Sequence, residues 1–224
     1  PIAAKLSSLL DGTKVYIEND ANAAAKAEAF AGVAKGAKYS VMITLGTGLG
    51  GGIIIDGKVY SGFNFAGAEL GHTVIEKGGR PCTCGRRGCW EAYSSATALI
   101  KSTREAMERN PDTIMWEMCE GNLANVNGRT AFNAMRQGDM VAAEVIDMYI
   151  EYLAVGIINI INIFCPEVLS IGGGISNEKD RLLDMLLPRI GMRIYSSNSP
   201  RRTLIKIAEL GNEAGIIGAA ALRA

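Results

Sequence analysis

Three cysteines and one histidine lie close together in the sequence and could bind a metal ion. Cys82, Cys84 and Cys89 follow a C-x-C-x4-C pattern, and His72, the only histidine of the chain, lies ten residues before Cys82. Structural zinc sites are tetrahedral and closed by four nitrogen or sulfur ligands of the protein, and this set supplies four. The pattern predicts a structural zinc site, with reduced, unliganded cysteines and a disulfide as the alternatives.

Carboxylates form a second group of candidate residues. Asp20 lies in ENDAN (18–22), where a predicted strand gives way to a predicted helix. It could cap that helix, or it could be a general base that accepts the proton of a substrate hydroxyl held by Asn19. Glu69 and Glu91 flank the cysteines. They could accept hydrogen bonds from a polyol, or they could be ordinary solvated side chains.

Two glycine-rich turns could approach phosphate groups, because exposed backbone amides at such turns bind anions. The first lies in LGTGLGGG (45–52) and contains Gly46, Thr47 and Gly48. The second follows a predicted buried strand and contains Gly172, Gly173 and Gly174. The first is not a Walker A loop and the second lacks G-x-G-x-x-G, so each could also be a plain turn.

The periodicity of apolar residues predicts an α/β fold that can position these groups. A first strand and helix are predicted at 14–20 and 21–32. From residue 40 onward, the predicted order is three strands, then a helix, and then two strand–helix pairs, which indicates a mixed five-stranded sheet covered by helices. The predicted strands lie at 40–46, 51–62 (two strands around an Asp-Gly turn), 167–176 and 202–210, and the helices at 91–110, 139–164, 177–190 and 212–224.

The composition narrows the class of protein. Apolar residues make up 48% of the 224 residues, and 23 basic residues balance 23 acidic ones, which argues against a general binder of nucleic acids or anionic membranes. The longest apolar run, 152–164, is shorter than the roughly 20 residues that a membrane span needs. Without a visible secretory signal, the cytoplasm is the predicted compartment. Cys119 and Cys165 are predicted to be small core residues.

Several motifs together resemble the ROK family of bacterial sugar kinases and sugar-responsive repressors, and within it the glucokinase type. The most specific is C-x-C-G-x-x-G-C-x-E (82–91). The others match in order and spacing over nearly the whole chain: ENDAN (18–22), LGTGLGGG (45–52), ELGH (69–72) and AGIIGAA (214–220). The implied fold is the second lobe of the actin/hexokinase-like (ribonuclease H-like) architecture, with a zinc-binding insertion at 69–91.

The resemblance also implies a role for each candidate residue. Asp20 would be the catalytic base on the 6-hydroxyl of glucose or a related hexose, and Asn19, Glu69, His72 and Glu91 would bind the other sugar hydroxyls. His72, Cys82, Cys84 and Cys89 would hold the structural zinc. ATP, bound with Mg²⁺, would contact Gly46, Thr47 and Gly48 with its phosphates, and Gly172, Gly173 and Gly174 on its adenosine side.

One motif of the family is missing from this sequence, the Asp-x-Gly-Gly-Thr hairpin of the first lobe. We therefore expect residues 1–36 to be the tail of that lobe and 37–224 to be the second lobe. We also expect the chain by itself to bind zinc but to have little kinase activity.

The main alternative is a sugar-sensing regulator of the same family, with a helix-turn-helix upstream. A third possibility is a sugar-binding or assembly module without catalysis. The family implies a homodimer, and no nucleic-acid or membrane partner is predicted for the kinase.

Overall fold

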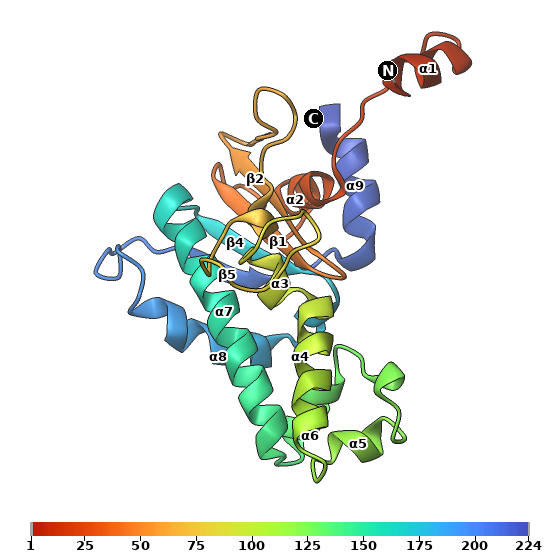
Figure 1. Cartoon of the computed structure of the whole chain (residues 1–224). Coiled ribbons are helices and arrows are strands. Elements are labelled where there is room, and N and C mark those ends of the chain that lie inside the picture. Colours follow the sequence, from red (N-terminus) through yellow and green to blue (C-terminus); the bar gives the residue numbers. More distant parts are fainter. Residues whose placement is uncertain (1, 224) are drawn as a thin grey trace.

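A computed structural model describes residues 2–223. Its centre is one mixed five-stranded sheet with the strand order β3-β2-β1-β4-β5 (Figure 1). Antiparallel pairing joins β1, β2 and β3 in a meander, while β4 lies parallel to β1, and β5 lies parallel to β4. The predicted mixed five-stranded sheet is confirmed. The strands are β1 (Ser40–Leu45), β2 (Leu49–Ile55), β3 (Lys58–Val59), β4 (Val168–Gly172) and β5 (Leu204–Ile207).

Side chains alternate between the two faces of β1, as the two-residue period of a strand requires. Val41, Ile43 and Leu45 belong to the main core, while Met42 belongs to a smaller cluster on the opposite face. β4 is buried along its whole length, as expected of a strand with parallel neighbours on both edges and helices on both faces of the sheet. The sheet is therefore a rigid platform, and the turns at its edge are fixed by the packing beneath them.

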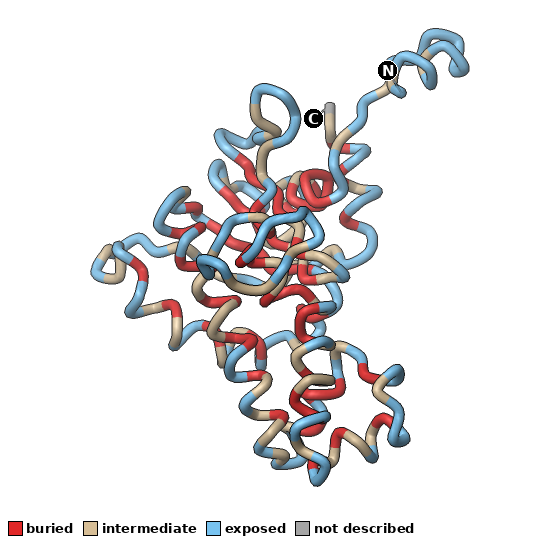
Figure 2. Tube along the Cα trace, in the orientation of Figure 1, coloured by how far each residue is buried: buried red, intermediate tan, exposed pale blue. Residues whose placement is uncertain are grey.

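Helices cover both faces. On one face lie α2 (Asp20–Ala31) and α9 (Ala214–Ala220). The two helices can pack closely because Gly218 has no side chain: a Cβ there would lie 1.8 Å from the Ala23 carbonyl oxygen. On the other lie α7 (Met140–Phe164) and α8 (Asp180–Gly191), together with α3 (Glu91–Ser94) and α4 (Ala96–Arg109). Figure 2 shows buried residues both in the sheet and along the helices below it. Two shorter helices, α5 (Met115–Met118) and α6 (Thr130–Arg136), pack near the N-terminal end of α7.

The apolar run at 152–164 forms the second half of α7, which begins after the N-cap Asp139 and buries one side of this run in the core. The helix ends at Phe164, and its C-cap Cys165, which precedes Pro166, has a left-handed backbone (φ 42°). Among the described residues, no helix combines the length and the apolar character needed to cross a bilayer.

Three expectations about local structure are wrong. Residues 14–19 form no strand, because no described strand lies beside them to complete a ladder. The helix predicted at 91–110 is two helices, since Ser95 adopts an extended backbone and caps α4 by accepting a hydrogen bond from the Ala98 amide. Cys119 is buried as expected, but Cys165 is exposed.

The first helix, α1 (Ile2–Leu9), lies away from the rest of the molecule at the end of the extended segment 13–19 (Figure 1). None of its residues is buried.

Candidate active site

Asp20 is positioned by the start of α2. Asn19, not Asp20, is the N-cap, and its Oδ1 accepts hydrogen bonds from the amides of Ala21 and Asn22 at 2.8 and 3.2 Å. Asp20 occupies the first turn of the helix, where the positive end of the helix dipole favours a carboxylate. Its Oδ1 accepts only the Ala21 amide, at 2.8 Å, among the described residues, and its side chain is exposed. The capping role is therefore filled by Asn19, and Asp20 is available to a ligand.

Asp20 faces a cavity of about 460 Å³, here called the carboxylate cavity. Three of its lining residues are the acids Asp20, Glu69 and Glu91. The structure thus brings together all five residues that were predicted from the sequence to contact the sugar: Asn19, Asp20, Glu69, His72 and Glu91. They come from three places in the chain, namely the start of α2, residues 69–72 and the start of α3. The remaining lining includes the first glycine turn. The predicted residues on its wall are Asn19, Asp20, Gly46, Thr47, Gly48, Glu69, His72 and Glu91.

Residues 69–91, here called the cysteine segment, fold into irregular loops with little regular structure. Isolated β-bridges join Val74 to Cys89 and Pro81 to Arg87. Gly88 permits the tight crossing with its left-handed backbone (φ 82°), and a Cβ there would lie 1.8 Å from the Glu76 carbonyl oxygen. The segment therefore depends on turns and backbone hydrogen bonds to hold its shape.

The four predicted metal ligands converge within this segment. One ligand atom from each of His72, Cys82, Cys84 and Cys89 lies within 4.8 Å of all the others. A tetrahedron with metal–sulfur bonds of about 2.3 Å has edges of about 3.8 Å. The Cys82 sulfur is 3.6 Å from the histidine Nδ1, and the sulfurs of Cys84 and Cys89 are also 3.6 Å apart. The four residues thus fit a zinc ion, and all the cysteines are free thiols rather than disulfides.

The position of His72 allows it both to bind a metal ion and to contact a substrate. Its Nδ1 faces the cysteine cluster, while the residue also lines the carboxylate cavity. The two ring nitrogens of histidine are chemically distinct, so Nε2 remains available when Nδ1 binds a metal. Metal binding and substrate binding by the same residue are therefore compatible.

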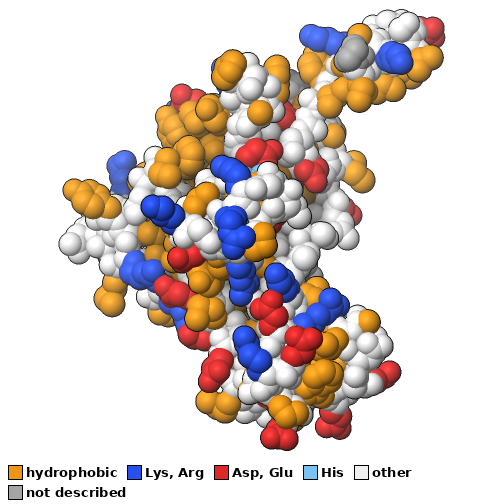
Figure 3. Space-filling model, viewed as in Figure 1, with side chains coloured by type: hydrophobic (Ala, Val, Ile, Leu, Met, Phe, Trp, Pro, Cys, Tyr) orange, Lys and Arg blue, Asp and Glu red, His pale blue; other side chains and the backbone are white. Residues whose placement is uncertain are grey.

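The thiols differ in their electrostatic surroundings. Hydrogen bonds from the backbone and side chain of Arg86 lower the pKa of the exposed Cys84 to about 6, whereas burial raises the pKa of Cys89 to about 12. A nearby positive charge favours the ionised form of a thiol. Besides Arg86, the segment carries the basic residues Lys77, Arg80 and Arg87. Figure 3 shows Lys and Arg side chains gathered over the front of the molecule, where Figure 1 places these loops.

Glu91 links the cysteine segment to the first glycine turn. Its Oε2 accepts a hydrogen bond from the Leu49 amide at 3.0 Å. A Cβ at Gly48 would lie 2.5 Å from the same oxygen, so glycine at this position is what allows the carboxylate to approach. The turn at 46–48 therefore has a steric reason for its glycine besides any contact with phosphate.

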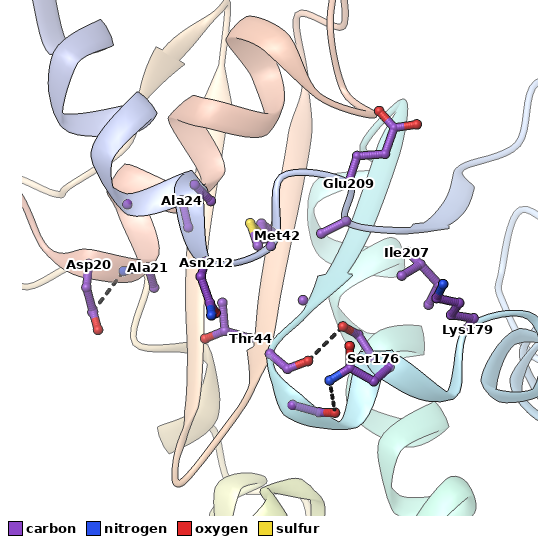
Figure 4. A pocket seen from close by; sticks show the side chains of 18 residues that line it. Asp20, Ala21, Ala24, Met42, Thr44, Ser176, Lys179, Ile207, Glu209 and Asn212 are labelled. Carbon is purple, nitrogen blue, oxygen red and sulfur yellow. Dashed lines mark hydrogen bonds between the residues drawn. The ribbon is translucent and has the colours of Figure 1, made fainter.

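Gly172, Gly173 and Gly174 line a second cavity of about 510 Å³, here called the triple-glycine cavity (Figure 4). Gly173 has a left-handed backbone (φ 84°), and a Cβ there would lie 2.6 Å from backbone atoms of Leu45. Sequence reasoning missed Lys179 and Asn212, which also line this cavity. Each follows a strand end, β4 and β5 respectively, and that position is the signal that could have found them.

Trp90 is another residue that the sequence did not single out. It is fully buried, and its Nε1 donates a hydrogen bond to the Tyr152 carbonyl oxygen of α7 at 3.0 Å. A Cβ at Gly156 would lie 1.9 Å from the indole ring. Trp90 therefore anchors the end of the cysteine segment, and with it Cys89 and Glu91, to the main core.

Comparison with known proteins places this architecture in a family. The ROK family model matches residues 1–224. The chain belongs to the ROK family. Glucokinase from Thermotoga maritima is 37% identical over 94% of this chain and 66% of its own length. The crystal structure of a ROK family glucokinase from Streptomyces griseus, in complex with glucose and AMPPNP, superposes with a TM-score of 0.87 at 33% identity, covering 99% of this chain and 72% of that one.

Regulators of the same family are also similar. The xylose repressor of Bacillus subtilis is 32% identical over 91% of this chain, but the match covers 49% of the repressor. The matched part of this chain thus spans about two thirds of the length of the Thermotoga maritima glucokinase and about half the length of the Bacillus subtilis xylose repressor. The comparisons confirm the predicted family and the actin/hexokinase-like fold of ROK glucokinases.

Proposed function

We propose that this chain forms the sugar-binding and catalytic lobe of an ATP-dependent hexose kinase that phosphorylates the 6-hydroxyl of glucose or a related sugar. One observation carries the proposal: Asp20 lines both the carboxylate cavity and the triple-glycine cavity. A base at this position can reach a hydroxyl in one cavity while a phosphate donor occupies the other. Phosphoryl transfer needs such positioning more than it needs covalent chemistry from the protein.

In this proposal, each cavity holds one substrate. The sugar lies in the carboxylate cavity, where Asn19, Glu69, His72 and Glu91 accept or donate hydrogen bonds to its hydroxyls. The triphosphate contacts Gly46, Thr47 and Gly48, and the adenosine lies along Gly172, Gly173 and Gly174. Mg²⁺ bound with ATP would neutralise phosphate charge. Asp20 accepts the proton of the 6-hydroxyl.

Zinc would have a structural role. His72, Cys82, Cys84 and Cys89 would hold it with all four positions filled by protein, so it has no open position for a substrate. Its effect would be to fix Glu69, His72 and Glu91 around the sugar. A homodimer and the cytoplasm as compartment complete the proposal; the first follows from the family, the second from the need for ATP.

The test is glucose binding together with glucose-dependent ADP formation. Both are measured for this chain and for a longer form that carries an Asp-x-Gly-Gly-Thr hairpin ahead of residue 1. We expect both forms to bind glucose and only the longer form to release ADP at a substantial rate. Asp20→Asn in the longer form should abolish ADP release and leave glucose binding within about threefold, because it removes the base and keeps the side chain's shape.

A sugar-sensing regulator is the second candidate, favoured by the match to the repressor. A regulator needs a sugar site but no base. Glucose binding without ADP release by the longer form would therefore support it and contradict the kinase.

A further inference from the structure

The carboxylate cavity and the triple-glycine cavity meet at three residues. Asp20, Ala21 and Thr44 line both of them. A group transferred from a donor in one cavity to an acceptor in the other must pass this place. Of the three side chains, alanine offers no polar group and the ionised aspartate can only accept hydrogen bonds. The hydroxyl of Thr44 is therefore the one side-chain donor among the residues that the two cavities share.

The sheet keeps the surroundings of Thr44 open. Thr44 is paired with Gly50 on β2 and with Gly172 on β4, so glycine stands at both of its cross-strand positions. A Cβ at Gly50 would lie 2.6 Å from Thr44 Oγ1, and one at Gly172 would lie 2.6 Å from the Met42 side chain. A larger residue at Gly50 would collide with the hydroxyl, and one at Gly172 would crowd the same face of the sheet.

Thr44 also lies on the appropriate face of the sheet. Its neighbours in β1, Ile43 and Leu45, enter the main core, whereas Met42 and Thr44 point to the opposite face, toward α2 and Asp20. Thr44 is half-buried, and its hydroxyl makes no hydrogen bond to any of the residues 2–223. In Figure 4, Asp20, Thr44 and Asn212 lie around the same part of the triple-glycine cavity. The side chain is thus ordered by the sheet but free to bind a ligand.

We propose that the Thr44 hydroxyl donates a hydrogen bond to an oxygen of the phosphoryl group that is transferred. This inference rests on the proposed kinase function and deepens it. In the step, the 6-hydroxyl oxygen of the sugar forms a bond to the γ-phosphorus while the bond from that phosphorus to the bridging oxygen of ATP breaks. The hydroxyl proton passes to Asp20, and ADP leaves with the electron pair of the broken bond. Thr44 holds the phosphoryl oxygens throughout and is itself unchanged.

The contact predicts a difference between two nucleotides that the unaltered chain should show. AMPPNP carries the γ-phosphoryl group and ADP does not, so a contact to this group favours AMPPNP alone. Thr44→Val keeps the shape of the side chain and removes the hydroxyl. We expect it to weaken the binding of Mg·AMPPNP by about tenfold or more, as loss of a hydrogen bond to a charged group does, and to leave Mg·ADP and glucose binding within about twofold.

The experiment is calorimetric titration of Mg·AMPPNP, Mg·ADP and glucose into the unaltered chain, Thr44→Val, Thr44→Ser and Thr203→Val. Thr44→Ser keeps the hydroxyl that Thr44→Val removes, so it should keep most of the preference for AMPPNP. Thr203 donates its hydroxyl to the Pro166 carbonyl oxygen and lines neither cavity, so its substitution controls for the loss of any threonine hydroxyl in the sheet region. Melting temperature and zinc content check that each variant is folded.

Two outcomes would overturn the inference while the proposed function stands: equal affinity of the unaltered chain for the two nucleotides, or a preference for AMPPNP that survives in Thr44→Val. If the unaltered chain binds neither glucose nor nucleotide, the proposed function fails and this inference fails with it.

Discussion

The carboxylate cavity has two walls that are held together in different ways. The wall formed by the sheet rests on buried strands, and Val41, Ile43 and Leu45 beneath it are almost completely excluded from solvent. The wall formed by the cysteine segment has apolar support only near its ends, at Leu70 and Trp90: between residues 72 and 88, only Gly88 is buried. Hydrophobic burial therefore fixes one wall, whereas turns, backbone hydrogen bonds and the Cys/His cluster fix the other.

Because they are stabilised differently, the two walls should respond differently to loss of the Cys/His cluster. The sheet wall, together with the start of α2 that packs on it, carries Asp20 and the first glycine turn, and it should persist whenever the domain is folded. The cysteine segment carries Glu69, His72 and Glu91, and it should hold its shape only while its ligand cluster is intact. Sugar binding would then depend on the proposed metal, although the metal would contact neither substrate.

The largest expected effect comes from breaking the metal cluster. Cys89→Ser removes the buried thiol of the proposed zinc site, and because metal binding and local folding are coupled, zinc and the order of the cysteine segment should be lost together. We expect glucose affinity to fall by about a hundredfold and amide hydrogen exchange to rise sharply in 73–90. The strands β1 and β4 should keep their protection.

A matched control for this variant is Cys165→Ser, because Cys165 is an exposed thiol outside the cluster. It should keep zinc, glucose affinity and the exchange pattern. Unchanged exchange in 73–90 of a zinc-free Cys89→Ser chain would show that the segment needs no metal, and the contrast between the two walls would disappear.

The second variant breaks the joint between the two walls. Trp90→Ala empties the space between the cysteine segment and α7 and removes the hydrogen bond to the Tyr152 carbonyl. Truncation of a buried tryptophan costs about 3–5 kcal/mol of unfolding free energy. Chemical denaturation should show this loss, and the zinc content of the chain that remains folded should fall too. A stability within about 1 kcal/mol of the unaltered chain would exclude the anchoring role.

A third variant strains the sheet wall alone. Gly173→Ala places a Cβ 2.6 Å from the Leu45 backbone and forces alanine into a left-handed conformation. We expect a loss of about 1–3 kcal/mol in thermal unfolding, with zinc content unchanged. Gly174→Ala is the matched control, because its Cβ meets no atom within 4 Å and its backbone needs no positive φ. Equal stability of the two variants would contradict the predicted close approach.

The smallest expected effect lies at Asp139, the N-cap of α7. Burial opposes ionisation there, but hydrogen bonds from the Ala142 amide, the Thr113 hydroxyl and the Ile114 amide outweigh it and lower the pKa of Asp139. Since its pKa is lower in the folded state, the stabilisation is present above the unfolded value of about 3.9 and is lost as pH falls through the folded pKa.

Asp139→Asn should therefore cost about 1 kcal/mol of unfolding free energy at pH 7 and progressively less below pH 4. Urea denaturation at pH 7 and at pH 3 measures this cost. The zinc content at pH 7 should not change. A cost that is the same at pH 7 and pH 3 would show that the charge of Asp139 contributes nothing.

Features set by local sequence were predictable from the chain alone. The meander β1–β2–β3 follows from alternating apolar runs and an Asp-Gly turn, and the metal ligands lie within 18 residues of one another. Features that need a distant partner were not predictable. The β-branched and aromatic residues at 14–19 favour a strand, but the strand does not form without a neighbour. Lys179 and Asn212 meet at one cavity only because α8 and α9 follow adjacent strands.

The candidate site shows the same division. Asn19 and Asp20 both had the chemistry of a helix cap, and only the structure assigns the cap to Asn19. His72 was nominated for two roles, and the direction of its Nδ1 is what makes them compatible. The place where the two cavities meet depends on strand register across three strands, which no single motif of the sequence encodes.

The central claim is that residues of both walls bind one sugar. Amide chemical-shift mapping by NMR during glucose titration of the zinc-loaded chain tests it most directly. We predict that the shifts concentrate in 19–21 and 46–50 of the sheet wall and in 69–72 and 91 of the cysteine segment, and that residues 14–60 and 69–91 respond at the same glucose concentration. Shifts confined to one wall, or centred outside the carboxylate cavity, would contradict it.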